Sequence, residues 1–409
     1  MRQQIYKFYV YTKQQGIRKA LIKTRSYISK SNVAKVTPVL KQPIEVMASV
    51  EDVIKADYIN HPYKTPPKKK NKKSLKIGWV LSPVSAGSGG QNTITRFVRH
   101  LQKVGHEVTI YIYEGIHPQL ADDAKKILRE SFNLDVDVKK VTQYEESDAL
   151  IATGWETAYP VFNIKTKAHK FYFVQDFEPY FYGLGSKAIL AENTYKMNFY
   201  GITAGRWLTK RVSEYGMKAD YFDFGADMDI YRSKNPSNKQ KKVCFYARPV
   251  TERRAFELGV IALDRFHKKH PEYTIEFFGW DVSNYQIPFP YINRGIITHS
   301  KLADLYHESV ACLVLSLTNV SLLPLELLAA GCIPVMNEGE NNSLVLGENK
   351  YIHYSPASPI QLADELCKVV ERKDIDKYTQ KASESVKSLS WDDSYVKVEK
   401  IIRREVCGE

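Results

Sequence analysis

Short, continuous apolar segments alternate with amphipathic helical segments along most of this chain. The first series begins with KIGWVLS at 76–82, and the second begins with KKVCFYARP at 241–249. Strands that are apolar on both faces must be covered on both faces, which is typical of parallel sheets between layers of helices. Each series has roughly 150 residues, the usual size of one domain. The sequence therefore predicts an α/β protein with two doubly wound, Rossmann-like domains.

The pattern within each series predicts the elements and the domain boundaries. We expect one domain at 76–230 and a second at 231–390, with a C-terminal segment at 391–409 that completes the first domain. Residues 1–75 form an extension and linker ahead of them. The expected strands are 76–82, 106–113, 148–154, 170–176, 241–249, 274–280, 311–317 and 333–336, and the expected helices are 92–104, 192–198, 206–216, 251–270, 301–310, 324–331 and 391–406.

The positive charge of the chain is confined to its N-terminal extension. Residues 1–75 carry 17 Lys/Arg against 4 Asp/Glu, which gives +13. The whole chain carries 59 against 46, also +13, so residues 76–409 have no net charge. A body that binds nucleic acid is expected to carry its own basic face, so no nucleic-acid partner is predicted.

The extension itself has the composition of a membrane-surface segment. Residues 1–44 contain no acidic residue, and basic residues from Arg2 to Lys30 are interleaved with aromatic ones. This pattern suits a basic amphipathic helix at an anionic membrane surface, and the alternative is a helix packed on its own protein. The following TPPKKKNKK, at 65–73, predicts a linker, because prolines oppose a helix and lysines repel one another.

Three absences in the sequence bear on compartment and cofactor. The chain has no run of 18 apolar residues and no apolar signal core, so neither a membrane span nor secretion is expected. Its five cysteines are scattered without the spacing of metal ligands. We therefore expect a cytoplasmic protein, peripheral on the inner face of the plasma membrane, with reduced cysteines and neither a metal nor another cofactor.

The loop GSGG at 87–90 follows the first expected strand directly. It does not match G-x-G-x-x-G, which disfavours a dinucleotide site. Glycines ahead of a helix let backbone N–H groups approach an anion or a sugar, and strand ends in open α/β sheets face the ligand crevice. Gly89 and Gly90 are therefore candidate substrate-binding residues, the alternative being a tight turn.

Arg248 and Arg253 lie at the end of the first strand of the second domain. Two guanidinium groups at this point would flank a diphosphate and donate paired N–H bonds to it. The N-terminus of the next helix adds its partial positive charge. The alternative is a surface ion pair with Glu252 or Glu257.

The segment SLTNVSLLPLELLAAGCIPV, at 316–335, places Glu326 in the first turns of a helix. The loop before it, from Asn319 to Leu322, is expected to present backbone amides to a ligand. A glutamate at this position can accept hydrogen bonds from the ribose hydroxyls of a nucleotide. The alternative is a charge that complements the helix dipole, an effect of ~0.3–1 kcal/mol.

Polar residues also follow the very apolar strand in FYFVQDFEPYFYG, at 171–183. Gln175, Asp176 and Glu178 come at its carboxyl end, where a crevice is expected. The neighbouring aromatic side chains could stack on the faces of a sugar. The alternative is an aromatic loop in the core.

Together these residues resemble the retaining GT-B glycosyltransferases of the large bacterial group that includes sucrose synthase and many mannosyl- and glucosyltransferases. The likeness covers roughly residues 76–405. YARPVTERR resembles the motif G-R-x-x-x-x-K, with Arg248 at the arginine and Arg253 at the lysine. Thr318 through Glu326 resembles the motif of two glutamates, with Thr318 in place of the first one, which contacts the donor sugar. Gln175 occupies the position of the family's N-domain histidine.

Two further stretches resemble a subgroup, the bacterial rhamnan-chain rhamnosyltransferases. They are the QDFE run and ITAGRWLTKRVSEYG at 202–216, while FGADMDIY at 224–231 resembles the interdomain segment of the wider family. The likeness implies dTDP-β-L-rhamnose as donor and a rhamnose-terminated, lipid-linked glycan as acceptor. It also implies that 76–230 is the acceptor domain and 231–390 the nucleotide-sugar donor domain. Thr318 fits a deoxy sugar, which has one hydroxyl fewer to bind.

The resemblance implies a retaining, metal-independent glycosyltransferase. Arg248 and Arg253 would stabilise the leaving diphosphate, and Asp176 would orient or deprotonate the acceptor. Two other classes stay open: a GT-B enzyme with another donor, such as a hexosyltransferase or a sugar-nucleotide epimerase, and a non-catalytic glycan-binding protein. The candidate substrate-binding residues are Gly89, Gly90, Gln175, Glu178, Lys301, Thr318, Asn319, Val320, Ser321, Leu322 and Glu326.

Overall fold

This computed structural model describes residues 44, 46–115, 117–232, 239–320 and 322–409. Within it, Val46–Glu409 form one compact unit built on two parallel sheets. The predicted membrane-surface segment at 1–44 therefore lies almost wholly outside the described residues. Among the described helices, none is long and apolar enough to cross a bilayer.

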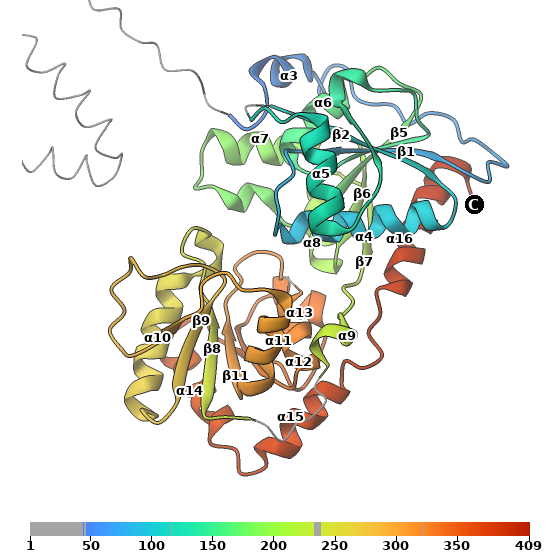
Figure 1. Ribbon diagram of the computed structural model, residues 1–409. Coiled ribbons are helices and arrows are strands. Elements are labelled where there is room, and N and C mark those ends of the chain that lie inside the picture. The colour runs from blue at the N-terminus through green and yellow to red at the C-terminus, as the bar shows by residue number, and fades with distance from the viewer. Residues whose placement is uncertain (1–43, 45, 116, 233–238, 321) are drawn as a thin grey trace, which may run out of the picture. The chain divides into compact units, whose positions relative to one another are not determined.

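The N-terminal sheet contains seven parallel strands in the order β3-β2-β1-β4-β5-β6-β7. The first strand, β1, lies inside the sheet. The strands β2 and β3 are added on one side of it, and β4 to β7 are added on the other side. Its strands are buried because helices such as α4, α5 and α6 pack around the sheet, as Figure 1 shows. The strands are β1 (Lys76–Leu81), β2 (Glu107–Ile112), β3 (Asp137–Lys140), β4 (Ala149–Ala152), β5 (His169–Val174), β6 (Tyr200–Ala204) and β7 (Ala219–Phe222).

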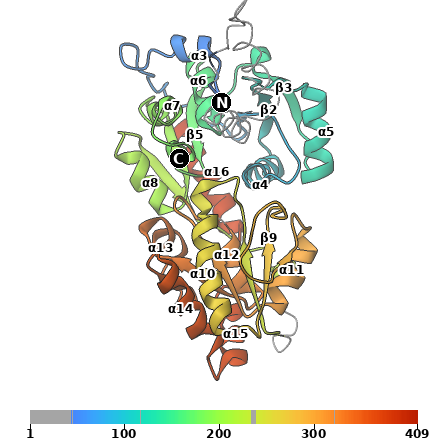
Figure 2. The ribbon, with the colours of Figure 1, turned by 90° about the vertical axis from the view of Figure 1, so that its left-hand side faces the viewer.

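The C-terminal sheet contains six parallel strands in the order β10-β9-β8-β11-β12-β13. It repeats the same arrangement, since β8 lies between β9 and β11 and the chain changes direction there. A separate hydrophobic core surrounds it, and the helices α10 and α14 pack side by side on it (Figure 2). The strands are β8 (Lys242–Tyr246), β9 (Thr274–Phe278), β10 (Ile292–Asn293), β11 (Ala311–Val314), β12 (Ile333–Asn337) and β13 (His353–Ser355).

The helices alternate with the strands, as a doubly wound topology requires. In the N-terminal half they are α3 (Val50–Lys55), α4 (Gly89–Lys103), α5 (Ala121–Phe132), α6 (Trp155–Asn163), α7 (Ser186–Thr194) and α8 (Arg206–Ser213), with short 3₁₀ turns η2 (Val141–Gln143) and η3 (Glu178–Phe181). In the C-terminal half they are α9 (Met228–Tyr231), the 3₁₀ turn η4 (Glu252–Arg254), α10 (Phe256–Lys269), α11 (His299–Glu308), α12 (Leu323–Ala329), α13 (Glu340–Leu346), α14 (Pro359–Val370), α15 (Ile375–Glu384) and α16 (Asp392–Cys407).

The last helix, α16, returns to the N-terminal sheet and packs against α4 and β7. Trp391, just before α16, and Tyr395 meet Phe97 of α4 edge-on, with ring centroids 6.2 and 5.5 Å away. A Cβ at Gly225 would lie 2.6 Å from the backbone nitrogen of Trp391. The segments around Gly225 and Trp391 therefore pack too closely for a side chain at Gly225. This contact completes the first core with a segment from the end of the chain.

Two expected helices have different bounds in the structure. The helix expected at 251–270 begins only at Phe256, because Ala255 takes a left-handed conformation with φ of 46° and separates η4 from α10. The helix expected at 192–198 is the end of α7, which stops at Thr194, and Asn198 beyond it has φ of 61°. Left-handed residues interrupt a right-handed helix, and Ala is not a residue that signals them in a sequence.

The lysine-rich segment at 65–73 is not the linker that the sequence predicts. The backbone N–H of Lys69 donates to the carbonyl of Val406 in α16 at 2.7 Å, and Arg403 donates to the carbonyls of Lys72 and Lys73. The Nζ atoms of Lys69 and Lys72 reach the buried carboxylate of Asp148 at 2.8 and 2.6 Å. Mutual repulsion of the lysines is offset by this buried acidic partner, so the segment belongs to the N-terminal domain.

We expect Asp148→Asn to destabilise this domain by about 1–3 kcal/mol, because the substitution removes a buried charge that Lys69, Lys72 and the N–H of Lys76 share. Burial acts to raise the pKa of Asp148, but bonds from the two lysines outweigh it and the pKa lies below its usual value. The stabilisation is therefore complete above about pH 4 and is lost as the pH falls through the lowered pKa. Urea unfolding at pH 7 and pH 3 measures it, with exposed Asp137→Asn as the control. Equal stability of Asp148→Asn and wild type at pH 7 would contradict this assignment.

Candidate functional site

Many of the predicted site residues lie just beyond the carboxyl ends of four strands. In the N-terminal sheet, Gly89 and Gly90 begin α4 after β1, and Gln175 and Asp176 follow β5. In the C-terminal sheet, Arg248 follows β8, and the loop from Ser316 follows β11. Both β1 and β8 are strands at which the direction of sheet building reverses. Ligands of open α/β sheets bind at such reversals, outside the carboxyl ends of the strands.

The carboxylate of Asp176 joins the two sheets. One oxygen accepts a hydrogen bond from the backbone N–H of Asn319 at 2.9 Å and the other accepts from the hydroxyl of Thr318 at 3.1 Å. The Nε of Arg253 donates to the second oxygen at 3.1 Å. Asp176 also accepts from the N–H of Phe177. The structure thus brings Asp176, Arg253, Thr318 and Asn319, which lie far apart in the sequence, into direct contact.

The side chain of Asn319 forms a second link between the sheets. Its Nδ2 donates to the backbone carbonyls of Gln175 and Ala204, each at 3.0 Å. Asn319 is only 2% exposed, so its position is set by these buried bonds. The amide of Gln175 in turn lies close to the glycine loop, since a Cβ at Gly90 would be 3.4 Å from its Nε2. Gly90 therefore leaves room for this side chain.

Arg253 and Arg254 point to different partners although they are neighbours in η4. Arg253 has its guanidinium carbon 3.9 Å from the centre of the Phe181 ring, a cation–π contact with the N-terminal half. Arg254 is buried in the C-terminal half, where its Nη1 donates to the Ser316 hydroxyl at 2.6 Å. Burial lowers the pKa of Arg254 from its usual value. The sequence analysis missed Arg254, because two adjacent arginines give no sign of which one faces inward.

A network of buried amides fixes the loop after β11. The N–H of Ser316 donates to the side-chain oxygen of Asn337 at 2.8 Å. The Nδ2 of Asn341 donates to the carbonyls of Ser316 and Thr318 at 2.9 and 2.5 Å. Because Asn341 binds the loop's carbonyl groups, the loop is fixed with the Thr318 hydroxyl and the Asn319 N–H directed toward Asp176.

Glu326 lies in α12 beside a second ion pair between the two halves. Burial raises the pKa of Glu326 to about 8, and the charge of Asp227 adds to this effect while Arg96 opposes it. Arg96, from α4, binds the carboxylate of Asp227 through both terminal nitrogens, at 2.9 and 2.5 Å. A partly buried carboxyl group with a raised pKa is a common feature of functional sites.

The remaining predicted residues have varied surroundings. Arg248 is half-buried, with a long 3.5 Å contact from Nη1 to the Tyr246 hydroxyl, and its Nε has no hydrogen-bond partner among the described residues. Lys301 is exposed in the first turn of α11. Val320 is buried, Leu322 is partly buried, and Ser321 lies outside the described residues. No hydrogen bond or ion pair connects these residues with Asp176 in the described part of the chain.

Glu178 is buried rather than exposed in a crevice. One of its carboxyl oxygens accepts from the N–H of Trp155 and from the hydroxyl of Tyr172, both at 2.6 Å. Burial raises its pKa well above the usual value, and the charge of Glu156 adds to this. Burial therefore favours the protonated form of this carboxyl group, which anchors the start of α6. A sequence cannot distinguish such a buried acid from Asp176, two residues away.

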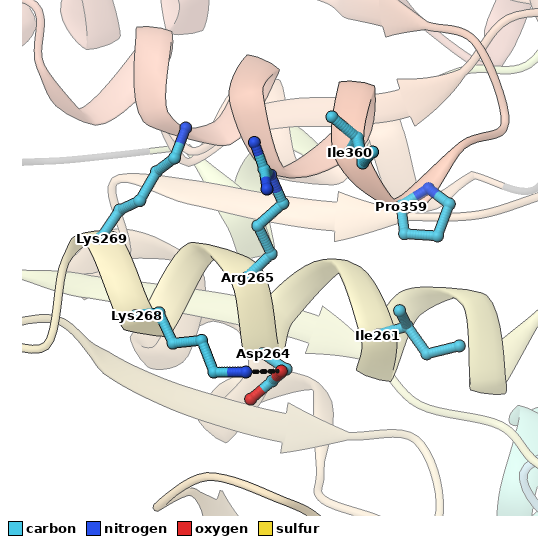
Figure 3. Close-up of a pocket in the computed structure, with 7 residues that line it drawn as sticks. All are labelled: Ile261, Asp264, Arg265, Lys268, Lys269, Pro359 and Ile360. Carbon is cyan, nitrogen blue, oxygen red and sulfur yellow. Dashed lines mark hydrogen bonds and ion pairs between the residues drawn. The ribbon is translucent and has the colours of Figure 1, made fainter.

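Two other features of the described residues lie away from this site. A surface hollow of about 390 Å³, drawn in Figure 3, lies between α10 and α14 and contains none of the predicted residues. His270, Cys367 and Glu371, at the C-terminal ends of the same two helices, have possible metal-binding atoms within 4.8 Å of one another. The hollow is lined by Ile261, Asp264, Arg265, Lys268, Lys269, Pro359 and Ile360.

Comparison with known proteins agrees with the fold and its two halves. Residues 117–204 match the WsaF N-terminal domain, and residues 241–367 match the WsaF C-terminal domain. The O-antigen biosynthesis protein RfbC of Myxococcus xanthus is 30% identical over 293 residues. That alignment covers 66% of this chain but 22% of RfbC, so the chain spans about a fifth of this relative.

Solved structures with the same architecture are distant in sequence. Sucrose-phosphate synthase from Thermosynechococcus elongatus has a TM-score of 0.60 at 11% identity, covering 80% of this chain and 98% of that one. Anabaena HepE, solved with UDP and glucose, has a TM-score of 0.61 at 12% identity and covers 80% and 99%. The chain therefore has the GT-B fold of these glycosyltransferase structures. It carries both domains of the WsaF family, in the order in which their names place them.

Proposed function

We propose that this protein transfers L-rhamnose from dTDP-β-L-rhamnose to a rhamnose-terminated, lipid-linked glycan, with retention of the anomeric configuration. The observation that carries the proposal is the convergence of Arg253, Thr318 and Asn319 at the carboxyl ends of both sheets. WsaF is a rhamnosyltransferase family, and the name of RfbC connects that relative with O-antigen biosynthesis. Both support a role in assembling a surface polysaccharide.

The donor would bind to the C-terminal half. Arg253 and the amide of Asn319 already face a carboxylate, Asp176, and N–H donors that bind a carboxylate also suit the oxygens of a diphosphate. Arg248 lies five residues before Arg253, and its buried Nε has no hydrogen-bond partner among the described residues. It would therefore add a second guanidinium group to the donor site. Glu326 would accept a hydrogen bond from the 3′-hydroxyl of the deoxyribose. Thr318 presents one hydroxyl to the sugar, which suits a deoxy hexose.

The reaction itself would need charge stabilisation more than proton transfer. The acceptor hydroxyl oxygen forms a bond to the anomeric carbon, the bond from that carbon to the diphosphate oxygen breaks, and the hydroxyl proton passes to the diphosphate. Arg248 and Arg253 would stabilise the charge on the leaving oxygens without a metal ion, and the loss of one such donor typically costs ~10²–10³ in rate. Asp176 would orient the acceptor from the leaving-group face.

Nucleotide binding tests the donor site directly. We expect Arg248→Ala to weaken dTDP binding about ten- to hundredfold, and Glu326→Ala to do so above about pH 8, since a charge-assisted hydrogen bond contributes ~1.5–3 kcal/mol. A carboxylate accepts hydrogen bonds better than the neutral acid, so wild-type affinity should rise as the pH increases through about 8, the raised pKa of Glu326. Calorimetry from pH 6.5 to 9 measures both effects, and Glu326→Gln should lose the pH dependence.

Lys301→Ala provides a comparison within the same half, because this exposed lysine contacts no other predicted residue in the described structure. The affinity of the Lys301→Ala variant for dTDP shows whether α11 also belongs to the donor site. Unchanged affinity in both Arg248→Ala and Glu326→Ala would remove the proposed donor site.

Metal independence follows from the same account. The acidic pair Asp227 and Asp229 lies in the segment between the sheets, and Asp227 is already bound to Arg96. We expect transfer activity to remain within about twofold after treatment with EDTA, because arginine side chains supply the positive charge. Loss of turnover on chelation that Mg²⁺ restores would show that the two-arginine account is wrong.

The N-terminal extension would hold the enzyme beside a lipid-linked acceptor. Near an anionic leaflet each Lys or Arg contributes about 1 kcal/mol, reduced by salt. Three apolar side chains just after the basic segment, Ile44, Ile54 and Ile59, are 78%, 76% and 75% exposed, which suits contact with lipid. Residues 64–75 pack on the N-terminal domain, so a truncation that preserves the fold should begin at Val46.

We expect the chain that begins at Val46 to lose most of its flotation with anionic liposomes while it keeps turnover on a short soluble acceptor. The physical reason is the loss of ten basic residues and no acidic residue other than Glu45. Flotation in 0.1 and 0.5 M salt, with neutral liposomes as the control, measures the electrostatic part. Equal flotation of the truncated and full chains would exclude membrane attraction by this segment. Loss of soluble-acceptor activity would instead favour packing of the segment on the enzyme.

A further inference from the structure

A second carboxylate lies at the reversal of the N-terminal sheet, where the sequence analysis proposed no acidic residue. Ser82 follows β1 directly, and Glu156 follows β4 in the first turn of α6. These two strands are adjacent, with Val80 opposite Ala152. The position is equivalent to that of Arg248 and the Ser316 loop in the other sheet, which follow the adjacent strands β8 and β11.

The side chain of Glu156 is held over this reversal. The hydroxyl of Ser82 donates a hydrogen bond to the Oε1 of Glu156. A Cβ added at Gly154 would lie 2.8 and 2.9 Å from the two carboxylate oxygens of Glu156, so the group folds back over the end of β4. Ser82 and Glu156 are both partly exposed. The carboxylate is therefore oriented by the protein and remains accessible to solvent.

The other acids at these strand ends are already bound. Asp176 accepts hydrogen bonds from Arg253, Thr318 and Asn319. Glu178 is buried, and it accepts from the N–H of Trp155, the residue before Glu156. Glu156 has one hydrogen-bond donor among the described residues, the Ser82 hydroxyl, so its other oxygen can accept from a ligand.

We propose that Glu156, with Ser82, binds a hydroxyl group of the acceptor sugar and orients it for transfer. The proposal rests on the proposed function, which assigns the acceptor to the N-terminal half. A carboxylate that is partly shielded and held in place by one hydroxyl binds a sugar hydroxyl with a charge-assisted hydrogen bond. The hydroxyl of Tyr182 accepts from the Nε1 of Trp155, the residue before Glu156, at 3.1 Å, which places an aromatic side chain at the start of α6.

A purely structural role for Glu156 is the competing explanation. An acidic residue in the first turn of a helix complements the helix dipole and stabilises the helix slightly. Asp122 occupies the same position in α5, second in the helix, and is exposed in the same half of the protein. Asp122→Asn is therefore a matched control for the helix effect without a change at the sheet reversal.

Two variants of the full-length chain test the proposal by different means. Glu156→Gln removes the charge and keeps the shape of the side chain. Gly154→Ala keeps Glu156 but displaces its carboxylate, and its backbone tolerates the change because φ is −159°. We expect each variant to weaken the binding of a rhamnose oligosaccharide about tenfold in calorimetry, while dTDP affinity stays within twofold. In turnover, the acceptor KM should rise while hydrolysis of the sugar nucleotide by water persists.

The outcomes separate this proposal from the proposed function. Unchanged oligosaccharide affinity in Glu156→Gln, a parallel loss in Asp122→Asn, or no binding of the oligosaccharide by the wild-type chain would each overturn the role of Glu156. A wild-type chain that binds the oligosaccharide through Glu156 but neither binds dTDP nor transfers sugar would overturn the proposed function alone. A fall in thermal stability of Glu156→Gln without a change in oligosaccharide affinity would favour the structural role.

Discussion

Asp176 makes the hydrogen bonds on which the contact between the two sheets depends. Its carboxylate follows β5 in the first sheet and accepts from Arg253, Thr318 and Asn319 of the second. A shielded carboxylate is costly unless its oxygens are bound, so the three donors and Asp176 stabilise one another's positions. The loop after β11 can supply its donors because its own carbonyls are bound by Asn341. The same hydrogen bonds thus fix the loop after β11 and connect the two halves.

The topology explains why these groups can meet at all. Every strand in both sheets is parallel to its neighbours, so the loops at the carboxyl ends of each sheet lie along one edge. At β1 and β8 the sheet grows in both directions, which separates the following helices and leaves the strand ends accessible. The same constraint places Ser82 and Glu156 in one half in the position that Arg248 and Ser316 hold in the other.

The sequence predicted the two-sheet fold and the edge on which the site lies, because both follow from local patterns of apolar residues and loops. It did not predict which side chains at that edge face solvent. Asp176 and Glu178 are two residues apart and follow the same strand. Asp176 binds the second sheet through Asn319, whereas Glu178 is buried and accepts from the N–H of Trp155. The lysine-rich segment was misjudged for a related reason: its buried partner, Asp148, is distant in sequence. Pairings of this kind depend on tertiary contacts that a local pattern does not contain.

The acids of the N-terminal half also show how burial divides similar groups among different tasks. Glu178 accepts hydrogen bonds from the N–H of Trp155 and the hydroxyl of Tyr172, and neither donor is a cation, so burial favours its protonated form. These bonds fix the backbone of Trp155 and with it the start of α6. Glu156, the next residue along the chain, is partly exposed and accepts from the Ser82 hydroxyl at the reversal of the sheet. The buried acid therefore supports the more exposed one by positioning the start of α6.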